Sequence, residues 1–339
     1  MPSYHPPFTL TSEIVSLVAD ISGHVGRLSV QLDQELQLKL RRINRIRTVT
    51  GSLAIEGNML TEAQIAAILD GKRVIAPPCE ILEASNALTA YEQLPNWQGS
   101  RQDDLLAAHR LLMQGLIDSA GRYRSGGVGV MAGSTVLHMA PPASQVPRLM
   151  DDLFSWLATT TDHPLIVSSV FHYEFEFIHP FADGNGRIGR LWQTLLLSHW
   201  QKIFAYIPVE SRVHRHQAGY YQALNQSTAQ TDSAAFIAFM LQRIKEALAD
   251  TAGSPHDAPQ VTPQVVKLLQ VLTYAMSREQ LQRQLGLADR KSFRQAYLQP
   301  ALEQGLIEMT LPDKPQSKLQ QYRITSIGKA VLHRVKQQE

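Results

Sequence analysis

Apolar residues recur at every third or fourth position through most of the first 250 residues, a spacing typical of amphipathic helices. Thr61 followed by Gln64 forms a capping box, which predicts a helix that begins at residue 62 and ends at Asp70-Gly71. The basic run from Arg41 to Arg47 favours a helix end there, because cations stabilise helix C-termini. The helices predicted by spacing cover residues 12–21, 32–46, 62–69, 80–92, 103–117, 145–158, 165–178, 187–200, 217–228 and 234–249.

Glycine and β-branched residues replace this pattern between Gly121 and Pro142. Short β-branched runs at 128–130 and 135–136 flank a turn signal at 132–134. We expect a two-stranded hairpin here, the only convincing β element in the helical body. Because an isolated hairpin is only marginally stable, it must pack against the helices or act as a flap over another surface.

Composition changes again near residue 250. Pro, Gly, Ser and Thr gather in residues 251–262, which is typical of a linker. Beyond it, helical patterns at 263–274, 277–285 and 290–304 precede two short strands, 305–310 and 321–325, around Pro312-Asp-Lys-Pro. This order predicts a winged helix-turn-helix. We therefore expect four parts: a helical region at 1–100, a core at 101–250, a linker at 251–262 and a winged-helix domain at 263–339.

The composition excludes several classes of protein. With 339 residues, 44% of them hydrophobic and 18% charged, the chain is not wholly disordered. Its one cysteine, Cys79, allows no intrachain disulfide and no multi-cysteine zinc site, and is expected to be inert. We see no secretory signal and no apolar run long enough to span a membrane, so we expect a cytoplasmic protein without membrane association.

The C-terminal quarter is basic although the whole chain has a net charge of +2. Residues 260–339 hold 12 Lys and Arg against 6 Asp and Glu, which gives +6 and leaves −4 for the rest. Arg290, Lys291 and Arg294 lie at the start of the third helix predicted in this region. They are candidates for contacts with DNA phosphates, and equally for the solvated face of a protein-interaction module.

The densest group of reactive residues lies at 179–190, between two apolar helices. Gly184-Asn185-Gly186 leads into the second helix, where free backbone N–H groups and the helix dipole favour an anion. Arg187 and Arg190 share a helix face and can both bind phosphate oxygens. Asp183 is an oxygen ligand of the kind that Mg²⁺ prefers, and His179 can accept a proton near neutral pH. Together these residues indicate transfer of a phosphate-containing group to a nucleophile.

The run His-Pro-Phe-Ala-Asp-Gly-Asn-Gly-Arg-Ile-Gly-Arg at 179–190 matches the Fic family signature H-P-F-x-[DE]-G-N-G-R-x-x-R at every fixed position. The chain resembles Fic proteins over about residues 32–248, and its tail resembles the winged-helix domain often appended to bacterial members. This resemblance implies a mainly α fold, a Fic-type helical bundle with a β-hairpin flap. It also implies that AMP is transferred from ATP to a Ser, Thr or Tyr hydroxyl of a protein, with release of pyrophosphate.

The resemblance implies a role for each signature residue. His179 would be the base that takes the hydroxyl proton, and Asp183 would hold Mg²⁺, or Mn²⁺, on the α and β phosphates. Arg187 would hold the β phosphate and Arg190 the γ phosphate. The phosphates would be cradled by Gly184, Asn185 and Gly186. The loop would be held in shape by Pro180 and Phe181.

A second motif, Ser52-Leu-Ala-Ile-Glu56-Gly-Asn58, resembles the inhibitory pattern [ST]-x-x-x-E-[GN] of Fic proteins. The resemblance implies that Glu56 pairs with Arg190 beside the ATP site. A carboxylate in this place would occupy the guanidinium that should bind the γ phosphate and would repel the nucleotide. We therefore expect an autoinhibited chain in which ATP binds out of line for attack.

Other residues keep two interpretations. Tyr220 and Tyr221 resemble the nucleoside side of the family's ATP site, and either can stack on adenine or pack in the core. His172 is expected to pack in the core. His138 lies in the flap, where it contacts a target or is simply exposed.

Partners and reaction direction are also left open. The flap at 128–142 is expected to align an unidentified target protein by adding a strand to its edge. Self-modification, a homodimer and DNA bound through the C-terminal domain are further expectations. The alternatives to AMP transfer are AMP removal, transfer of another nucleotide or phosphate, and a nucleotide-sensing DNA-binding regulator.

Overall fold

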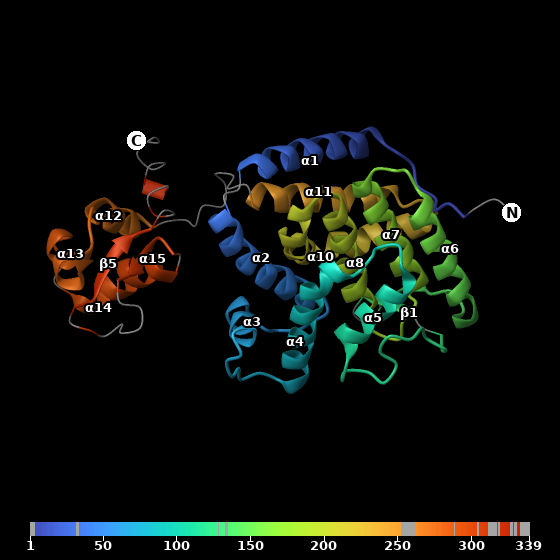
Figure 1. The fold of residues 1–339 in the computed structure, drawn as a ribbon, viewed down its shortest axis with the longest axis horizontal. Coiled ribbons are helices and arrows are strands. Elements are labelled where there is room, and N and C mark those ends of the chain that lie inside the picture. The colour runs from blue at the N-terminus through green and yellow to red at the C-terminus, as the bar shows by residue number, and fades with distance from the viewer. Residues whose placement is uncertain are drawn as a thin grey trace. The chain divides into compact units, whose positions relative to one another are not determined.

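The computed structural model describes residues 4–31, 34–127, 129–132, 135–251, 262–287, 289–303, 305–310, 317, 319–325, 328 and 331–332. The chain divides into two compact units, 1–252 and 253–339 (Figure 1). Most of the expected linker at 251–262 and the expected wing at 312–315 lie outside the described residues. The boundary expected at residue 100 stays a prediction.

The first unit is built almost entirely of helices. Its α-helices are α1 (Ser12–Gln31), α2 (Gln34–Ile55), α3 (Glu62–Leu69), α4 (Pro78–Gln93), α5 (Gln102–Met113), α6 (Val146–Thr159), α7 (Pro164–Ile178), α8 (Asn185–Trp200), α9 (Val209–Arg215), α10 (Gln217–Gln230) and α11 (Ala234–Thr251). Short 3₁₀ turns are η1 (Leu94–Asn96), η2 (Ala143–Gln145) and η3 (Lys202–Tyr206). The capping box predicted at Thr61 is confirmed, with both of its hydrogen bonds present.

Helices α7 and α8 lie at the centre of the first unit. α7 is buried along most of its length, and Leu165, Phe171 and Phe175 are fully enclosed. α1 packs along α11 (Figure 1). α2 packs against α9. A helix covered on all sides is apolar all round, which accounts for the sequence of α7. Because the candidate chemistry lies in the loop between α7 and α8, the core fixes both ends of that loop.

Helix α2 is longer than its sequence pattern predicted. The expected helix end near Arg41 to Arg47 is wrong, since the helix continues to Ile55 and these residues lie in its middle. The buried residues Val49 and Leu53 extend the apolar stripe by another two turns. Arg45 pairs with Glu92 of α4 at 2.8 Å, so the basic run contacts a neighbouring helix. This extension carries α2 to the candidate active site.

Other boundaries also differ from the prediction. α5 ends at Met113 and not at residue 117, because Gly115 takes a left-handed conformation (φ 75°) that a helix does not continue. The sequence pattern gave no sign of η3 and α9, which follow α8 closely.

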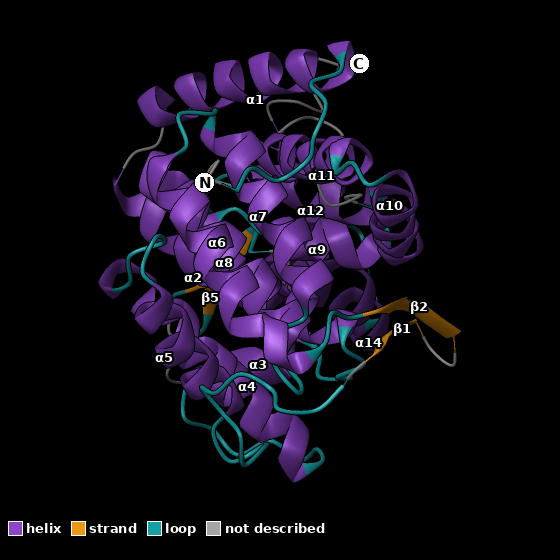
Figure 2. Cartoon of the chain, turned by 90° about the vertical axis from the view of Figure 1, so that its right-hand side faces the viewer, coloured by secondary structure: helices purple, strands orange, loops and turns teal. Residues whose placement is uncertain are grey.

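The predicted hairpin is confirmed between β1 (Gly129–Ala132) and β2 (Thr135–Met139). The strands are antiparallel, with Gly129 opposite Met139, and the register shifts between Val130 and Met131. Figure 2 shows the hairpin at the edge of the helical body. A register shift of this kind adds local twist to a two-stranded ribbon.

The second unit has its own hydrophobic core. Its elements are α12 (Pro263–Val271), β3 (Met276–Ser277), α13 (Arg278–Gln284), α14 (Arg290–Phe293), the π-helical turn η5 (Arg294–Leu298), α15 (Gln299–Glu303), β4 (Ile307–Met309) and β5 (Gln321–Ile324). The strands form an antiparallel sheet in the order β3-β5-β4. The three predicted helices and two predicted strands are present, and β3 is a third strand that the sequence pattern missed.

No helix within the described residues has both the length and the apolar character needed to cross a membrane.

Candidate active site

The loop after α7 begins at His179, which caps the helix in a left-handed conformation (φ 50°, ψ 61°). This conformation costs energy for any residue other than glycine, so the surrounding structure must hold it. Phe181 is fully buried below the loop. Asn185 binds both backbone groups of Phe181: its Oδ1 accepts from the N–H at 2.9 Å and its Nδ2 donates to the carbonyl at 2.9 Å. In this structure, therefore, the Asn185 side chain fixes the shape of the loop.

Gly184 forms the entrance to α8. It has φ 82°, and a Cβ atom there would lie 2.6 Å from Sδ of Met113, so both conformation and space require glycine. No side chain caps the N-terminus of α8. The first N–H groups of a 16-residue helix are thus left for an anion at this point.

Two buried residues that the sequence did not single out support the loop. The ring of His109 stacks on Phe181 with centroids 3.6 Å apart. Its Nδ1 accepts from the Gly121 N–H at 2.8 Å, so Nε2 carries the proton and donates to the Asp183 carbonyl at 3.0 Å. Burial lowers the pKa of His109 to about 4, which keeps the ring neutral.

Arg124 is the second support. Its guanidinium donates to the carbonyls of Ile178 and His179 at the end of α7, and to those of Gly126 and Pro141 on either side of the hairpin. The Arg124 side chain therefore links the segments on either side of the hairpin to the backbone of His179, the candidate general base.

The two signature arginines each hold a carboxylate from a distant part of the sequence. Arg187 Nη1 donates to Glu83 Oε1 of α4 at 2.6 Å, and its Nη2 donates to Asp183 Oδ1 at 3.0 Å. The second oxygen of Glu83 accepts from Asn58 Nδ2 at 2.9 Å. Glu83 was not predicted from the sequence, and it links Arg187 to the turn that follows α2.

Arg190 is buried, with only 2% of its side chain exposed, and it contacts the end of α2. Its Nη2 donates to Glu56 Oε1 at 2.7 Å and to the Ser52 carbonyl at 3.0 Å, and Nε donates to Ser52 Oγ at 3.2 Å. Burial, the largest single influence, favours a lower pKa for Arg190, but Glu56, Tyr220 and Glu176 together outweigh it and the pKa is raised. Gly186 leaves room for this pair, since a Cβ atom there would lie 2.4 Å from Glu56 Oε1.

A buried polar cluster lies behind His179 on α7. Glu176 is four residues after His172 and three before His179, and its carboxyl oxygens lie 3.8 Å from Nε2 of the first and Nδ1 of the second. Burial raises the pKa of Glu176 to about 8, while Arg190 opposes the shift and Glu56 adds to it.

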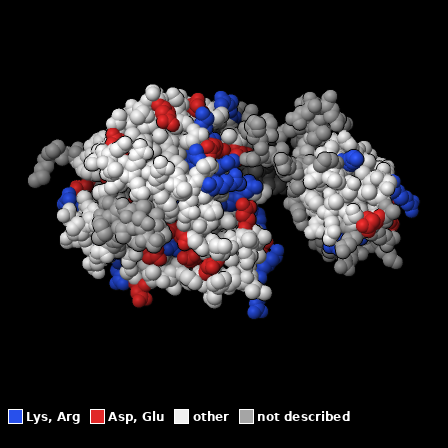
Figure 3. Space-filling model, turned by 180° about the vertical axis from the view of Figure 1, so that it is seen from behind, with Lys and Arg blue, Asp and Glu red and all other residues white. Residues whose placement is uncertain are grey.

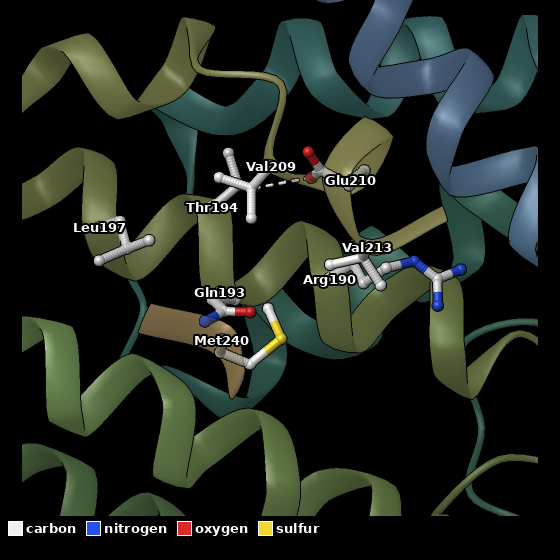
Figure 4. Close-up of a pocket in the computed structure, with 8 residues that line it drawn as sticks. All are labelled: Arg190, Gln193, Thr194, Leu197, Val209, Glu210, Val213 and Met240. Carbon is white, nitrogen blue, oxygen red and sulfur yellow. Dashed lines mark hydrogen bonds between the residues drawn. The ribbon is translucent and has the colours of Figure 1, made fainter. Parts of the chain in front are cut away.

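A small cavity lies beside Arg190 (Figure 4). The guanidinium points away from Gln193 and Met240, so the cavity is walled by the aliphatic part of the side chain. Glu210, at its edge, accepts hydrogen bonds from Tyr91 and Thr194, both at 2.9 Å. This cavity lies among the side chains of α8, α9 and α11. Its lining residues are Arg190, Gln193, Thr194, Leu197, Val209, Glu210, Val213 and Met240.

The structure thus joins five residues of the predicted site in two separate groups of side chains. Arg190 binds Ser52 and Glu56, and Arg187 binds Asp183. Tyr220 is 2% exposed and its hydroxyl bonds His172 Nε2 at 3.1 Å, so its side chain here serves the core. Tyr221 is half-buried. A contact of either tyrosine with ATP stays a prediction.

Comparison with known proteins finds matches in the region that contains these residues. The Fic/DOC family model matches residues 100–197, which include the signature, and the model of the Fic-like C-terminal domain matches residues 263–325. A Fic family protein of known structure from Desulfovibrio desulfuricans G20 is 49% identical, with 95% of this chain and 99% of that chain covered and a TM-score of 0.71. This chain belongs to the Fic family. The family predicted from the signature is confirmed.

Curated relatives of this Fic protein are more distant. "Protein adenylyltransferase Fic" of Nematostella vectensis is 32% identical over 189 residues, which cover 52% of this chain and 42% of the relative. "Protein adenylyltransferase fic-1" of Caenorhabditis elegans is 30% identical over 189 residues, covering 51% and 35%. The present chain therefore matches less than half the length of these two relatives. The structure of C. elegans Fic-1 shares the fold, with 22% identity, a TM-score of 0.60 and coverage of 71% and 72%.

Proposed function

We propose that this Fic protein transfers AMP from ATP to a Ser, Thr or Tyr hydroxyl of a protein and releases pyrophosphate. One arrangement carries the proposal: an uncapped helix N-terminus at Gly184, two buried arginines on the first turns of that helix, and His179 at the other end of the same short loop. The names of the curated relatives support the same reaction.

Phosphate binding and proton transfer are assigned to different residues of the loop and of the start of α8. The N–H groups at the start of α8 receive phosphate oxygens, and Arg187 and Arg190 neutralise the β and γ phosphates. His179 takes the proton of the acceptor hydroxyl. The hydroxyl oxygen then forms a bond to the α phosphorus while the bond to pyrophosphate breaks.

Asp183 fits the metal that accompanies ATP. Its side chain is 58% exposed although Oδ1 already accepts from Arg187, so the carboxylate remains accessible. No group of three His, Cys, Asp or Glu residues that could hold a metal ion by itself occurs in the described part of the chain. This suits Mg²⁺, which is usually bound by one or two carboxylates together with substrate phosphates. When bound, the ion, Mg²⁺ or Mn²⁺, neutralises charge on the phosphates.

Autoinhibition by Glu56 is part of the proposal. The Glu56 carboxylate occupies a donor of Arg190 that the γ phosphate needs, while Ser52 holds the guanidinium in position. Glu56 must leave Arg190 before ATP can bind with its α phosphate in line.

The partners proposed for this Fic protein are those expected from its sequence. A target protein, or a second copy undergoing self-modification, would pair its backbone with an edge of the 128–142 hairpin. A homodimer and DNA bound by the second unit are further proposals. Figure 3 shows acidic and basic side chains interspersed over the displayed face of the first unit. The DNA proposal rests on the basic sequence of residues 260–339.

The reaction and its target can be tested together. The Glu56→Gly variant is added to a host lysate with ATP and Mg²⁺, and peptides are analysed by mass spectrometry. We expect Ser, Thr or Tyr residues to gain the mass of one AMP, and the gain to be absent with Glu56→Gly/His179→Ala. Phosphorylated peptides in place of adenylylated ones would contradict the proposed reaction.

A further inference from the structure

The buried carboxyl group of Glu176 faces the ring of the candidate base. Glu176 and His179 lie on the same face at the end of α7, with Oε2 of the first 3.8 Å from Nδ1 of the second. The side chains are 7% and 18% exposed, so the glutamate is shielded from water by the core while the histidine is partly open. Such a contact is longer than a hydrogen bond, and it is close enough for each group to influence the charge of the other.

His172, the other histidine beside Glu176, does not donate a hydrogen bond to it. Gln193 Oε1 lies 2.7 Å from His172 Nδ1, and the Gln193 amide nitrogen is directed to Ser169 Oγ, so Nδ1 of His172 carries the proton. His172 Nε2 then accepts from the Tyr220 hydroxyl at 3.1 Å. Burial lowers the pKa of His172 to about 3, which keeps it neutral. Oε1 of Glu176 has no hydrogen-bond partner among the described residues.

We propose that Glu176 is a positioning residue for His179. Its carboxyl group holds the Nδ1 side of the imidazole, so that Nε2 faces the acceptor hydroxyl, and its negative charge balances the imidazolium that forms when His179 takes the proton. The inference rests on the proposed role of His179 as base. The 3.8 Å separation shortens to a hydrogen bond in the complex with substrates, as catalytic contacts commonly do.

The charge of Glu176 depends on the groups around it. His172 and His179 face it from its own helix, Arg190 from α8, Glu56 from the end of α2 and Tyr220 from α10. Glu56 raises the pKa of Glu176, so the inhibitory carboxylate also favours the protonated form that cannot balance an imidazolium. In a protein without Glu56 the pKa of the carboxyl is therefore lower than in the wild type.

The same helix offers a matched control. Glu174 is also buried and its pKa is raised to about 7 by burial, but its Oε2 accepts from the Tyr4 hydroxyl at 2.8 Å. Glu174→Gln therefore removes a buried carboxyl from α7 without removing the one that faces His179.

The test uses the full chain with Glu56→Gly, alone and combined with Glu176→Gln or Glu174→Gln. Self-labelling with ATP labelled on the α phosphorus is followed between pH 6 and pH 9. Glu176→Gln should lower the labelling rate by roughly 10- to 100-fold with little change in KM for ATP. It should also remove the rise in rate that accompanies ionisation of Glu176 as the pH increases. Glu174→Gln should keep both the rate and the pH profile.

A second readout does not depend on activity. The imidazole signal of His179, assigned by its loss in His179→Ala, is titrated by NMR without ATP. We expect two coupled steps in the presence of Glu176 and one step in Glu176→Gln. Identical titrations would overturn the inference, whereas two steps in a protein that never labels would leave it standing and refute the proposed function.

If Glu176→Gln does not fold, Glu176→Asp replaces it. This variant keeps an ionisable carboxyl at a greater distance, so the second step should persist while the rate falls. An unchanged rate in Glu176→Asp would also overturn the inference.

Discussion

Replacing Glu56 by glycine removes the carboxylate that Arg190 holds, and we expect ATP to bind more tightly as a result. In the present structure Arg190 donates to Glu56 at 2.7 Å and to Ser52 at 3.0 and 3.2 Å. The γ phosphate must displace the first of these contacts. The variant leaves the Ser52 contacts in place, so Arg190 keeps its direction while the Nη2 group loses its contact with Glu56 and can donate to the γ phosphate instead.

The size of the effect follows from the burial of the pair. A hydrogen bond to a charged group contributes about 1.5–3 kcal/mol. Arg190 is 2% exposed but Glu56 is 31% exposed, so solvent screening places this pair at the lower end of the range. A competing contact of about 1.5 kcal/mol corresponds to roughly a 10-fold gain in ATP affinity when it is removed.

Calorimetric titration with ATP and Mg²⁺ measures this gain directly. Glu56→Gln separates charge from space, because it keeps the length of the side chain and should still give most of the gain. Glu62→Gln serves as the control, since Glu62 is an exposed carboxylate that lies 3.8 Å from Arg47 and far from the signature in the chain. A folded Glu56→Gly protein with the ATP affinity of the wild type would refute the reasoning.

Three further predictions concern the carboxylate that holds Arg187, the packing of α2 against α9, and the buried carboxyl group of Glu174. Glu83→Gln should raise ATP affinity several-fold by calorimetry, because Arg187 loses the carboxylate that it holds at 2.6 Å; unchanged affinity would contradict this. Gly51→Ala should lower the midpoint of thermal unfolding and raise self-labelling, since its Cβ would lie 2.6 Å from the backbone of α9 and force α2 away; a more stable, unlabelled variant would contradict it. The pKa of Glu174 is raised from 4.5 to about 7, so its stabilising effect is complete below pH 4.5 and is lost as the pH rises through 7. The unfolding free energy of the wild type, measured in urea, should therefore fall relative to Glu174→Gln over this interval, and a constant difference would refute the assignment.

The grouping of the signature residues around one loop was predictable because these residues are close in sequence. His179, Asp183, Arg187 and Arg190 lie within twelve positions that join two helices, so their spacing alone places them around one loop. The partner of Arg190 was also predicted, since Glu56 belongs to a short motif of its own.

The supports of the loop were not predictable in the same way. Glu83 lies 104 residues from Arg187, and Arg124 lies 55 residues from His179, so only the tertiary fold brings them together. His109 had no motif around it, and its role depends on stacking against Phe181. Glu176 did carry a signal that was overlooked, namely a carboxylate in a largely buried helix about one turn before the candidate base.

Helix boundaries failed where tertiary contacts or backbone conformation decided them. The pattern of α2 seemed to end at its basic run, but packing of Val49 and Leu53 carries the helix to Ile55. α5 stops early because Gly115 adopts a positive φ that a helical pattern of side chains does not reveal.

The position of the label in ATP tests the central claim most directly. The Glu56→Gly protein is incubated with Mg²⁺ and ATP that carries the label on either the α or the γ phosphorus, and protein-bound label is counted. AMP transfer predicts that only the α label is retained, and that His179→Ala abolishes it. Retention of the γ label, or undiminished labelling in the absence of His179, would contradict the account.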